Sequence, residues 1–351
     1  MPLLICSPSM ILRLTLLERL LHRAGRLPSP IMDSFGSVLF GRVFAVAVRR
    51  GVFESLRTGP RTLAEVSLAS GLAPDALMLF LESSTVGGYV RSRKGRYELT
   101  SGGRAWLLRG SPSSLVSLIG YFETLHQRWG NLDQSLERGT PAQPYYAKFQ
   151  AEDWRLYVYA MRDLARFLIP YILPRIGIPD GAHSLLDIGG SHGLYTFECV
   201  RRVPGLQGTV IDFPAVTSLT EELVREHQLD GRVSVLAGDL REIPYPSGQD
   251  VVFLFNVVHG LSPEENQQVI RRALEALKAG GKLFILEQCL ENRRRSPLAR
   301  FLPLMVGLNL LLEIGARAYA VEEIGQWCGP ARAFRRIRIP LPGLALMEAE
   351  R

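Results

Sequence analysis

The chain has 351 residues, 47% of them hydrophobic and 21% charged, a composition typical of a soluble globular protein. Its length is large for one hydrophobic core and fits two domains. The net charge of +7 comes from scattered arginines, so it gives weak support for binding to nucleic acid or an acidic membrane. The four cysteines are Cys6, Cys199, Cys289 and Cys328. Their spacing excludes a CxxC pair or a Cys/His metal site, and we expect a reduced, cytoplasmic protein without a bound metal.

The N-terminal residues are apolar, but they do not have the pattern of a signal peptide. No basic region precedes the apolar part, and Arg13 lies inside it. From Ile11 to Leu21 the apolar residues recur at helical spacing, which predicts an amphipathic helix. A second apolar segment, residues 301–314, is too short to span a bilayer and contains Pro303. We therefore expect no transmembrane helix and no membrane partner.

Residues 1–110 have the pattern of helices followed by a small hairpin. Gly71 can end one helix, and Pro74 can begin the next. A hairpin is then predicted around the Lys94-Gly95 turn. Two helices joined by a turn and followed by a hairpin predict a winged helix.

A winged helix can bind DNA through its second helix, which enters the major groove. Here that helix, residues 74–86, contains Asp75 and Glu82 and no Lys or Arg, a poor surface for phosphate or base contacts. The hairpin is basic, so a DNA-binding regulator stays an alternative. Its cations are Arg91, Arg93, Lys94 and Arg96. We expect instead a role in packing or dimerisation and no nucleic-acid partner.

Residues 111–180 are predicted to be helical and are rich in aromatic side chains. Those aromatic residues fit either an ordinary core or the lining of a pocket for a flat ligand. From Ser184 onward, apolar strand segments alternate with helical segments. Such strands predict a parallel sheet covered by helices, with right-handed connections. The last segment predicts a closing hairpin around Pro342-Gly343.

Three predicted strands end in residues suited to a single ligand. The first ends in LLDIGGSHG (185–193), a glycine-rich turn that lets the backbone approach a ligand closely. Asp187 precedes the glycines, where its charge would repel a pyrophosphate and attract an amine. Asp212 ends the second strand, where an acid accepts hydrogen bonds from ribose hydroxyls, and Asp239-Leu240 follow the third, suited to adenine. A ligand with an amine, a ribose and an adenine is predicted, which S-adenosylmethionine fits better than NAD.

In this order, the motifs resemble the class I S-adenosylmethionine-dependent O-methyltransferases that carry an N-terminal winged-helix dimerisation domain. The family includes plant phenylpropanoid and hydroxyindole enzymes and bacterial natural-product enzymes, and the resemblance covers nearly the whole chain. The matching segments are RVFAVAVRRGVFESL (42–56), RYELTSGGRAWL (96–107), LLDIGGSHG, GTVIDFP, GDLREIP, NVVHGLSPEEN and AGGKLFILEQ.

The resemblance implies an α/β fold. Its Rossmann-like, mostly parallel seven-stranded sheet would have helices on both faces and follow a mainly helical winged-helix domain. The implied division is a dimerisation domain in residues 1–110, a helical linker lining the acceptor pocket in 111–180, and the cofactor-binding methyltransferase domain in 181–351. A homodimer is also implied.

The resemblance further implies a site for S-adenosylmethionine. The matching positions are Asp187, Gly189, Ser191, Gly193, Asp212, Asp239, Leu240 and Asn256. The glycine loop would surround the methionine moiety, Asp212 would hold the ribose, and Asp239 and Leu240 would meet the adenine. Ser191 stands where the family usually has its middle glycine, and Asn256 stands where it often has a lysine.

A histidine ends the buried-strand segment DVVFLFNVVHG, at the edge where an open parallel sheet binds its ligand. A phenol-like hydroxyl has a pKa of about 10, so at pH 7 roughly one molecule in a thousand is ionised. A base positioned to remove that proton contributes about 10²–10⁴ in rate. The resemblance implies that His259 is this base and that Glu287, on the next strand, orients it. The alternatives are a strand-end histidine bonded to a backbone carbonyl and a helix-capping or surface glutamate.

Two departures from the family leave a second activity open. Gly260 replaces the aspartate that plant members have after the histidine. A second helper acid has no clear counterpart, and Glu313 and Glu322 are nearby candidates. Some members of the fold retain S-adenosylmethionine and catalyse hydroxylation, decarboxylation or pericyclisation, and this chemistry stays the alternative.

The acceptor side of the site is expected on two helices. Residues 301–314 resemble the acceptor-lining helix of the family, and Met305 and Asn309 lie four residues apart on one face. Met161 matches a methionine that packs near the reacting methyl group, although either methionine could equally fill the core. We therefore expect an O-methyltransferase that acts on a small, hydrophobic, aromatic hydroxylated molecule of phenolic or polyketide type.

Overall fold

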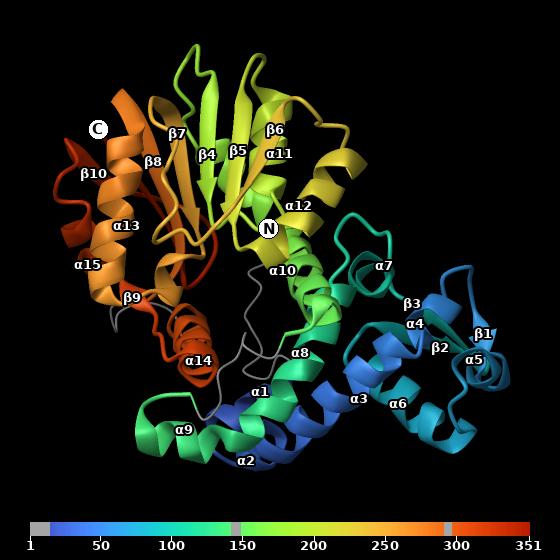
Figure 1. Cartoon of the computed structure of the whole chain (residues 1–351). Coiled ribbons are helices and arrows are strands. Elements are labelled where there is room, and N and C mark those ends of the chain that lie inside the picture. Colours follow the sequence, from blue (N-terminus) through green and yellow to red (C-terminus); the bar gives the residue numbers. More distant parts are fainter. Residues whose placement is uncertain (1–14, 142–148, 291–296) are drawn as a thin grey trace. The chain divides into compact units, whose positions relative to one another are not determined.

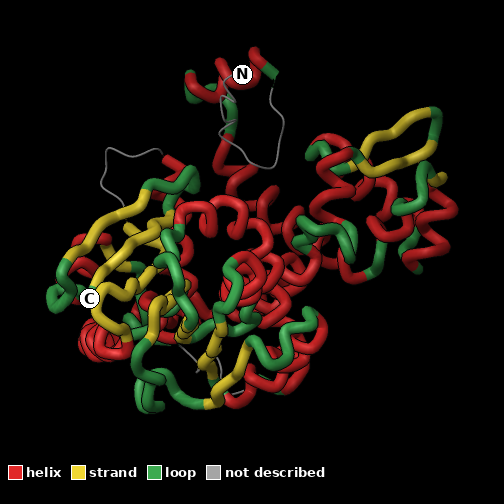
Figure 2. Tube along the Cα trace, turned by 90° about the horizontal axis from the view of Figure 1, so that it is seen from above, coloured by secondary structure: helices red, strands yellow, loops and turns green. Residues whose placement is uncertain are grey.

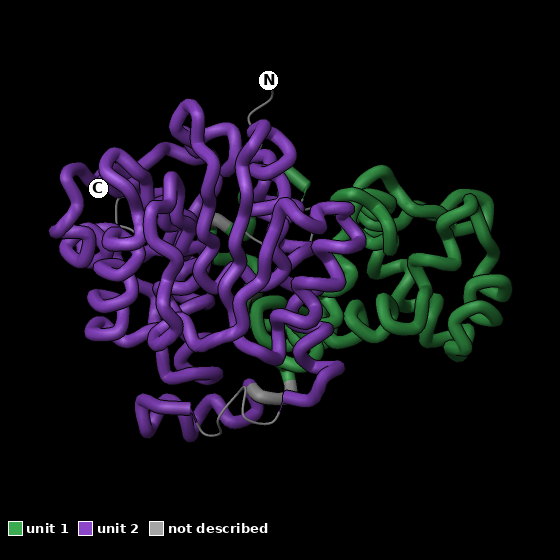
Figure 3. The backbone as a smooth tube through the Cα atoms, turned by 45° about the horizontal axis from the view of Figure 1, so that its top comes forward, with its two compact units in different colours: residues 1–127 green, residues 128–351 purple. Residues whose placement is uncertain are grey.

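The computed structural model describes residues 15–141, 149–290 and 297–351, which belong to two compact units (Figure 3). Unit 1 is Met1–Gln127 and unit 2 is Arg128–Arg351. The finer division of the chain into three parts stays a prediction. We describe each unit by itself.

Unit 1 is mainly helical and has one small three-stranded sheet, in the order β1-β3-β2. Its elements are α1 (Leu16–Arg23), α2 (Ser29–Ile31), the π-helix η1 (Met32–Gly36), α3 (Ser37–Arg49), α4 (Val52–Ser55), β1 (Arg61–Thr62), α5 (Leu63–Ser70), α6 (Pro74–Val86), β2 (Val90–Arg93), β3 (Arg96–Leu99), α7 (Ser101–Leu107) and α8 (Val116–Arg128). Gly71 ends α5 with a left-handed φ of 67°, and Pro74 begins α6, as predicted. Lys94 and Gly95 both have positive φ at the hairpin turn. The predicted order of helix, helix and hairpin is therefore present.

The structure describes only the second part of the amphipathic helix predicted from Ile11 to Leu21. The amphipathic helix is present as α1, which begins after a capping box formed by Thr15 and Glu18. The part of that prediction before Thr15 lies outside the described residues.

The cations of the basic hairpin are partly paired. Arg91 pairs with Glu98 at 2.7 Å and Arg96 with Glu65 at 3.4 Å, which reduces the positive charge offered to a partner.

Unit 2 is an α/β unit (Figure 1). Its elements are the 3-10 turn η2 (Trp129–Asn131), α9 (Leu132–Arg138), α10 (Ala151–Ile172), η4 (Leu173–Arg175), β4 (Ser184–Ile188), α11 (Leu194–Arg202), β5 (Gln207–Asp212), α12 (Pro214–Glu226), β6 (Val233–Ala237), β7 (Gln249–Phe255), η5 (Val258–Gly260), α13 (Pro263–Ala276), β8 (Leu277–Leu290), α14 (Pro297–Ile314), β9 (Tyr319–Ala320), α15 (Val321–Trp327), β10 (Ala333–Ile337) and β11 (Leu344–Glu350).

The sheet of unit 2 has the strand order β10-β11-β8-β7-β4-β5-β6. Strands β8, β7, β4, β5 and β6 are parallel, and β11 and β10 close the sheet as the predicted antiparallel hairpin. The mostly parallel seven-stranded sheet is thus confirmed, and the two-residue strand β9, paired with β8, adds an eighth. From β4 the chain first continues through β5 and β6 on one side and then crosses to β7 on the other. The carboxyl ends of β4 and β7 therefore form a topological switch point, where such sheets bind ligands.

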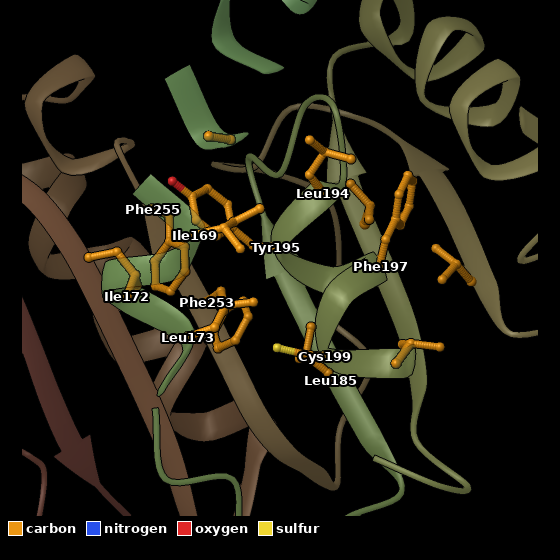
Figure 4. Packing of buried hydrophobic residues seen from close by; sticks show 14 of the residues in the cluster. Ile169, Ile172, Leu173, Leu185, Leu194, Tyr195, Phe197, Cys199, Phe253 and Phe255 are labelled. Carbon is orange, nitrogen blue, oxygen red and sulfur yellow. The ribbon is translucent and has the colours of Figure 1, made fainter. Parts of the chain in front are cut away.

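Helices cover both faces of this sheet because alternate strand residues point in opposite directions. Leu185 and Phe253 belong to the core under α10, α11 and α12, whereas Leu186 and Leu254 belong to the core under α13 and α15. Figure 4 shows the first core, where Phe253 and Leu185 lie beside residues of α11. In Figure 2 the yellow strands of the sheet lie among red helices.

The helix α14 is longer than the sequence indicated, and this corrects one argument. It begins at Pro297 and has 18 residues, so its length does not exclude a membrane span. Within the described part of the chain it is the one helix that is long and apolar enough by itself, and α5 with α6 passes only as a pair bent by 109°. Pro303 lies inside α14, and 22% of the helix is buried. Helices of soluble proteins pass the same test, so this is weak evidence for a membrane.

Candidate active site

A cavity lies at the switch point between β4 and β7. It is lined by the glycine loop after β4, the first turn of α11, the end of β7 and one face of α10. Five residues predicted for the site line it together: Met161, Asp187, Gly189, Ser191 and Asn256. The other lining residues are not among the predicted site residues: Tyr157, Leu164, Ala165, Gly190, His192, Tyr195 and Phe255.

The glycine loop has a conformation that side chains would prevent. Gly189 and Gly193 have φ of 71° and 70°. A Cβ atom at Gly189 would lie 2.6 Å from Val257, and one at Gly193 would lie 2.6 Å from the ring of Phe197. Ser191 also has a positive φ, 44°, which is strained for a residue with a side chain. The backbone of this loop is therefore fixed in an uncommon shape beside the cavity.

Two carboxyl groups lie at the loop, the buried Asp187 and the half-buried Asp212. Burial raises the pKa of Asp187 to about 7; a hydrogen bond of 2.7 Å from Thr196 Oγ1 opposes the rise, and the charge of Asp212 adds to it. Burial also raises the pKa of Asp212 to about 6, against hydrogen bonds from the backbone N–H groups of Phe213 (2.7 Å) and Ser191 (2.8 Å). A carboxylate has about four acceptor positions, so both groups keep capacity for a ligand. A cation beside Asp187 would restore its charged form.

His259 and Glu287 form a closely bonded pair. His259 lies in η5, three residues beyond Asn256, and Glu287 lies on the neighbouring strand β8 with none of its side chain exposed. His259 Nδ1 is 2.5 Å from Glu287 Oε1, and the backbone N–H of His259 donates to Glu287 Oε2 at 3.1 Å. A carboxylate bonded to Nδ1 places the ring proton there and leaves Nε2 with its lone pair. The imidazole is 18% exposed, which leaves it accessible to a small molecule.

The pKa of His259 reflects opposing effects. Burial alone would lower it, but the charge and hydrogen bond of Glu287, with the charge of Glu313, raise it above the ordinary value for histidine. Glu313 is buried on α14, which packs against η5, whereas Glu322 is exposed on α15. Of the two candidate helper acids, Glu313 is the one whose charge contributes to the raised pKa of His259. A side chain at Gly260 would first meet Ile314, at an ordinary 3.7 Å, so its absence is not a steric requirement.

The predicted adenine position is occupied by contacts within the chain. Asp239 accepts hydrogen bonds from Arg241 Nε at 2.9 Å and Nη2 at 2.5 Å, and the Arg241 hydrogen bond lowers the pKa of Asp239. Arg241 also reaches Glu265 at 2.9 Å. Leu240 is half-buried against the core, and Arg272 donates to the Leu240 carbonyl at 3.1 Å. This loop is therefore firmly held, but it does not line the cavity.

The predicted acceptor residues lie on two helices. Met161 on α10 lines the cavity, whereas Met305 on α14 is 42% exposed. The side-chain oxygen of Asn309 accepts a hydrogen bond of 3.0 Å from Trp129 Nε1. The structure thus brings Met161 to the cavity that the glycine loop lines, whereas Met305 and Asn309 are not among its lining residues.

Among the residues that the sequence analysis did not predict are Tyr195, which lines the cavity, and Thr196, which donates to Asp187. Both lie in the first turn of α11, directly after Gly193. A loop that precedes a helix presents the first helical turn to the same ligand, and this spacing could have indicated them. Among the residues described, no group of three or more His, Cys, Asp or Glu side chains could hold a metal ion.

Comparison with known proteins gives three kinds of match. The model of the O-methyltransferase domain family matches residues 139–326, more than half of the chain. A 3-hydroxy-5-methyl-1-naphthoate 3-O-methyltransferase from Streptomyces sahachiroi is 24% identical over 329 residues, 90% of this chain and 93% of that protein. An acetylserotonin O-methyltransferase from Bos taurus is 26% identical over 318 residues, 86% of this chain and 90% of that protein. The structure of human N-acetylserotonin methyltransferase in complex with SAM has the same fold, with a TM-score of 0.80 at 20% identity over 92% of this chain and 97% of that one.

Proposed function

The chain belongs to the O-methyltransferase domain family, and from this we propose that it methylates a hydroxyl group of a small, hydrophobic, aromatic molecule, with His259 as general base. S-adenosylmethionine is its methyl donor. The observation that carries the role of His259 is its pairing with the fully buried Glu287 at 2.5 Å, beside the cavity edge of the sheet.

The residues of the cavity fit S-adenosylmethionine. Asp187 offers a carboxylate to an ammonium group, and Asp212 has acceptor positions left for ribose hydroxyls. The cavity also contains buried hydroxyl oxygens without a partner in the protein, on Ser191 and Tyr195. Asn256, with a positive φ of 55°, adds an amide at the end of β7. When bound, the sulfonium supplies a methyl group that is already activated for transfer.

The residues of the chain are proposed to remove the proton of the acceptor hydroxyl. With Nδ1 bonded to Glu287, Nε2 of His259 accepts the proton of the hydroxyl as its oxygen attacks. The imidazolium that forms is stabilised by the Glu287 carboxylate, which is already in place and needs no reorganisation. The charge of Glu313 also raises the pKa of His259. These two acids make histidine a stronger base than it is in water.

An apolar aromatic acceptor is supported by the surroundings of the site. Tyr157, Leu164 and Phe255 line the cavity next to Met161. On α14, Phe301, Leu304 and Met305 are exposed. Two relatives are named for a hydroxynaphthoate and for acetylserotonin, both of which are aromatic molecules. We therefore propose phenolic or polyketide-like acceptors.

Unit 1 is proposed to mediate a homodimer. It exposes large apolar side chains on α1, α2, η1 and α3: Leu16, Leu17, Leu20, Ile31, Phe35, Val38 and Leu39. Exposed apolar patches of this kind mark interaction surfaces. Light scattering of the full chain should give the mass of two chains, and a single-chain mass contradicts the dimer. A cytoplasmic location stays a prediction.

The test of the proposed function is a screen of phenolic and polyketide-like acceptors with methyl-labelled S-adenosylmethionine. Label should appear in a hydroxylated aromatic acceptor as a methyl ether. Label that enters amines and no hydroxyl contradicts O-methylation.

A further inference from the structure

Two acids from different elements act on the proposed base. Glu287 on β8 accepts hydrogen bonds from the ring Nδ1 of His259 at 2.5 Å and from its backbone N–H at 3.1 Å. Glu313 on α14 is 6% exposed, and its charge also acts on His259. Within the described part of the chain, the charges that act on this histidine are therefore both negative. An acceptor whose hydroxyl approaches Nε2 comes under the field of both acids.

The end of α14 that carries Glu313 is fixed beside the turn η5. The next residue, Ile314, lies against Gly260, at 3.7 Å from the position of a Cβ atom there. Further along the chain, Tyr319 is 1% exposed, and its hydroxyl donates to the Leu261 carbonyl at 2.6 Å. A shift of Glu313 away from the histidine would therefore break these contacts.

The turn η5 is fixed by α13 as well. Asn266 on that helix is fully buried, and its Nδ2 donates to the carbonyls of Val258 at 3.0 Å and of Leu261 at 3.2 Å. The histidine and the two acids are thus held in place before an acceptor arrives, and salt screens buried charges much less than exposed ones. An anion brought into this region meets negative charges that do not move away.

The neighbouring cavity gives an anion no compensation. Asp187, which is 1% exposed, lines this cavity, and Met161 and Phe255 contribute apolar surface. No Lys or Arg belongs to its described lining. A carboxylate that enters such surroundings loses water without gaining a positive partner, which is unfavourable.

We propose that these acids make the acceptor site selective for uncharged hydroxylated aromatics, with Glu313 as the residue that disfavours a carboxylate on the ring of the reacting hydroxyl. The selectivity rests on the proposed function, since that function places the hydroxyl at Nε2 of His259. Two like charges roughly 8 Å apart, at an effective dielectric constant of about 20, repel enough to weaken binding about thirtyfold. The sulfonium charge of the cofactor offsets part of this repulsion, so we expect a preference of about tenfold.

A pair of acceptors with nearly the same shape tests the selectivity. The carboxylate of 3-hydroxy-1-naphthoate is ionised at neutral pH, whereas the carboxamide of 3-hydroxy-1-naphthamide is neutral. With saturating methyl-labelled S-adenosylmethionine, kcat/KM of the wild-type protein should be about tenfold higher for the amide than for the acid.

Three variants show whether Glu313 causes this preference. Glu313→Gln removes the charge and should lower the ratio of amide to acid to about threefold or less, whereas Glu313→Asp keeps the charge and should keep most of the preference. Glu322→Gln is the matched control, because Glu322 is exposed on α15, and it should leave the ratio unchanged. A weaker base slows both acceptors, so the ratio reports the selectivity alone.

Equal kcat/KM for the two acceptors in wild type, or a higher value for the acid, would overturn the proposal while O-methylation stands. An unchanged ratio in Glu313→Gln, or an equal change in Glu322→Gln, would remove Glu313 as its cause. Failure of the proposed function is a different result, in which no hydroxylated aromatic of the acceptor screen takes up label.

Discussion

Asp187 and Glu287 occupy comparable places in the sheet but are satisfied in different ways. Both are almost fully buried acids near the carboxyl ends of strands that flank β7. Glu287 accepts hydrogen bonds from the ring and backbone of His259 and from the backbone of Gln288. Asp187 has Thr196 as a donor, faces the cavity and has a pKa of about 7. Glu287 is satisfied by donors within the chain, whereas burial disfavours the charged form of Asp187, which a cationic ligand would favour.

The largest expected effect comes from removing His259, the proposed base. His259→Ala should lower the rate of methyl transfer about 10²–10⁴-fold, because it removes the base. Binding of S-adenosylhomocysteine should stay unchanged, since His259 does not line the cavity. Single-turnover assays and calorimetry measure the two effects separately, and full activity in the variant would remove His259 as base.

Glu287→Gln should reduce turnover by about 10²-fold and also move its pH dependence. In wild type the rate falls as pH drops through the raised pKa of His259, because the protonated ring cannot accept a proton. Without the Glu287 charge that pKa falls, so the acidic limb of the profile should shift to lower pH. The check is the pH profile of kcat/KM. An unshifted limb would mean that the limb does not report His259.

Asp187→Asn should weaken binding of S-adenosylmethionine about tenfold, because the ammonium loses its charged partner. The same variant should be more stable than wild type without ligand above pH 7. The folded-state pKa of Asp187, about 7, is higher than its ordinary value of 3.8. Wild-type protein therefore loses stability as the pH rises from the lower to the higher of these values. Asparagine does not titrate, so the variant does not have this loss. Thermal unfolding from pH 5 to 8 measures this, and a less stable variant at pH 8 contradicts the account.

Gly260→Ala should have the smallest effect, within about 0.5 kcal/mol of wild-type stability. Its Cβ would meet Ile314 at an ordinary distance, whereas Gly193→Ala would clash with Phe197 at 2.6 Å. Chemical denaturation compares the two variants. Strong destabilisation by Gly260→Ala would show that the glycine is a steric requirement after all.

The sequence predicts well what depends on local pattern. The apolar segments predict the parallel strands. The acids that follow these strands lie at one edge of the sheet, because the carboxyl ends of parallel strands meet there. The pairing of His259 with Glu287 was predicted from the resemblance, and the structure brings them within 2.5 Å. Met161 likewise lies with the glycine loop.

What the sequence could not predict depends on packing at long range. The burial of Glu313 depends on how α14 packs against η5. The residues next to Glu313 are apolar on all sides of the helix, so the sequence does not indicate which face is buried. The role of Tyr195 depends on a hydroxyl that lacks a partner, which a sequence does not reveal.

The most direct test of methyl transfer is to measure S-adenosylhomocysteine and methylated acceptor in one reaction. With an acceptor from the screen, wild-type protein should form the two products in equal amounts. Consumption of the acceptor without S-adenosylhomocysteine would contradict the account and favour a relative that keeps the cofactor for other chemistry.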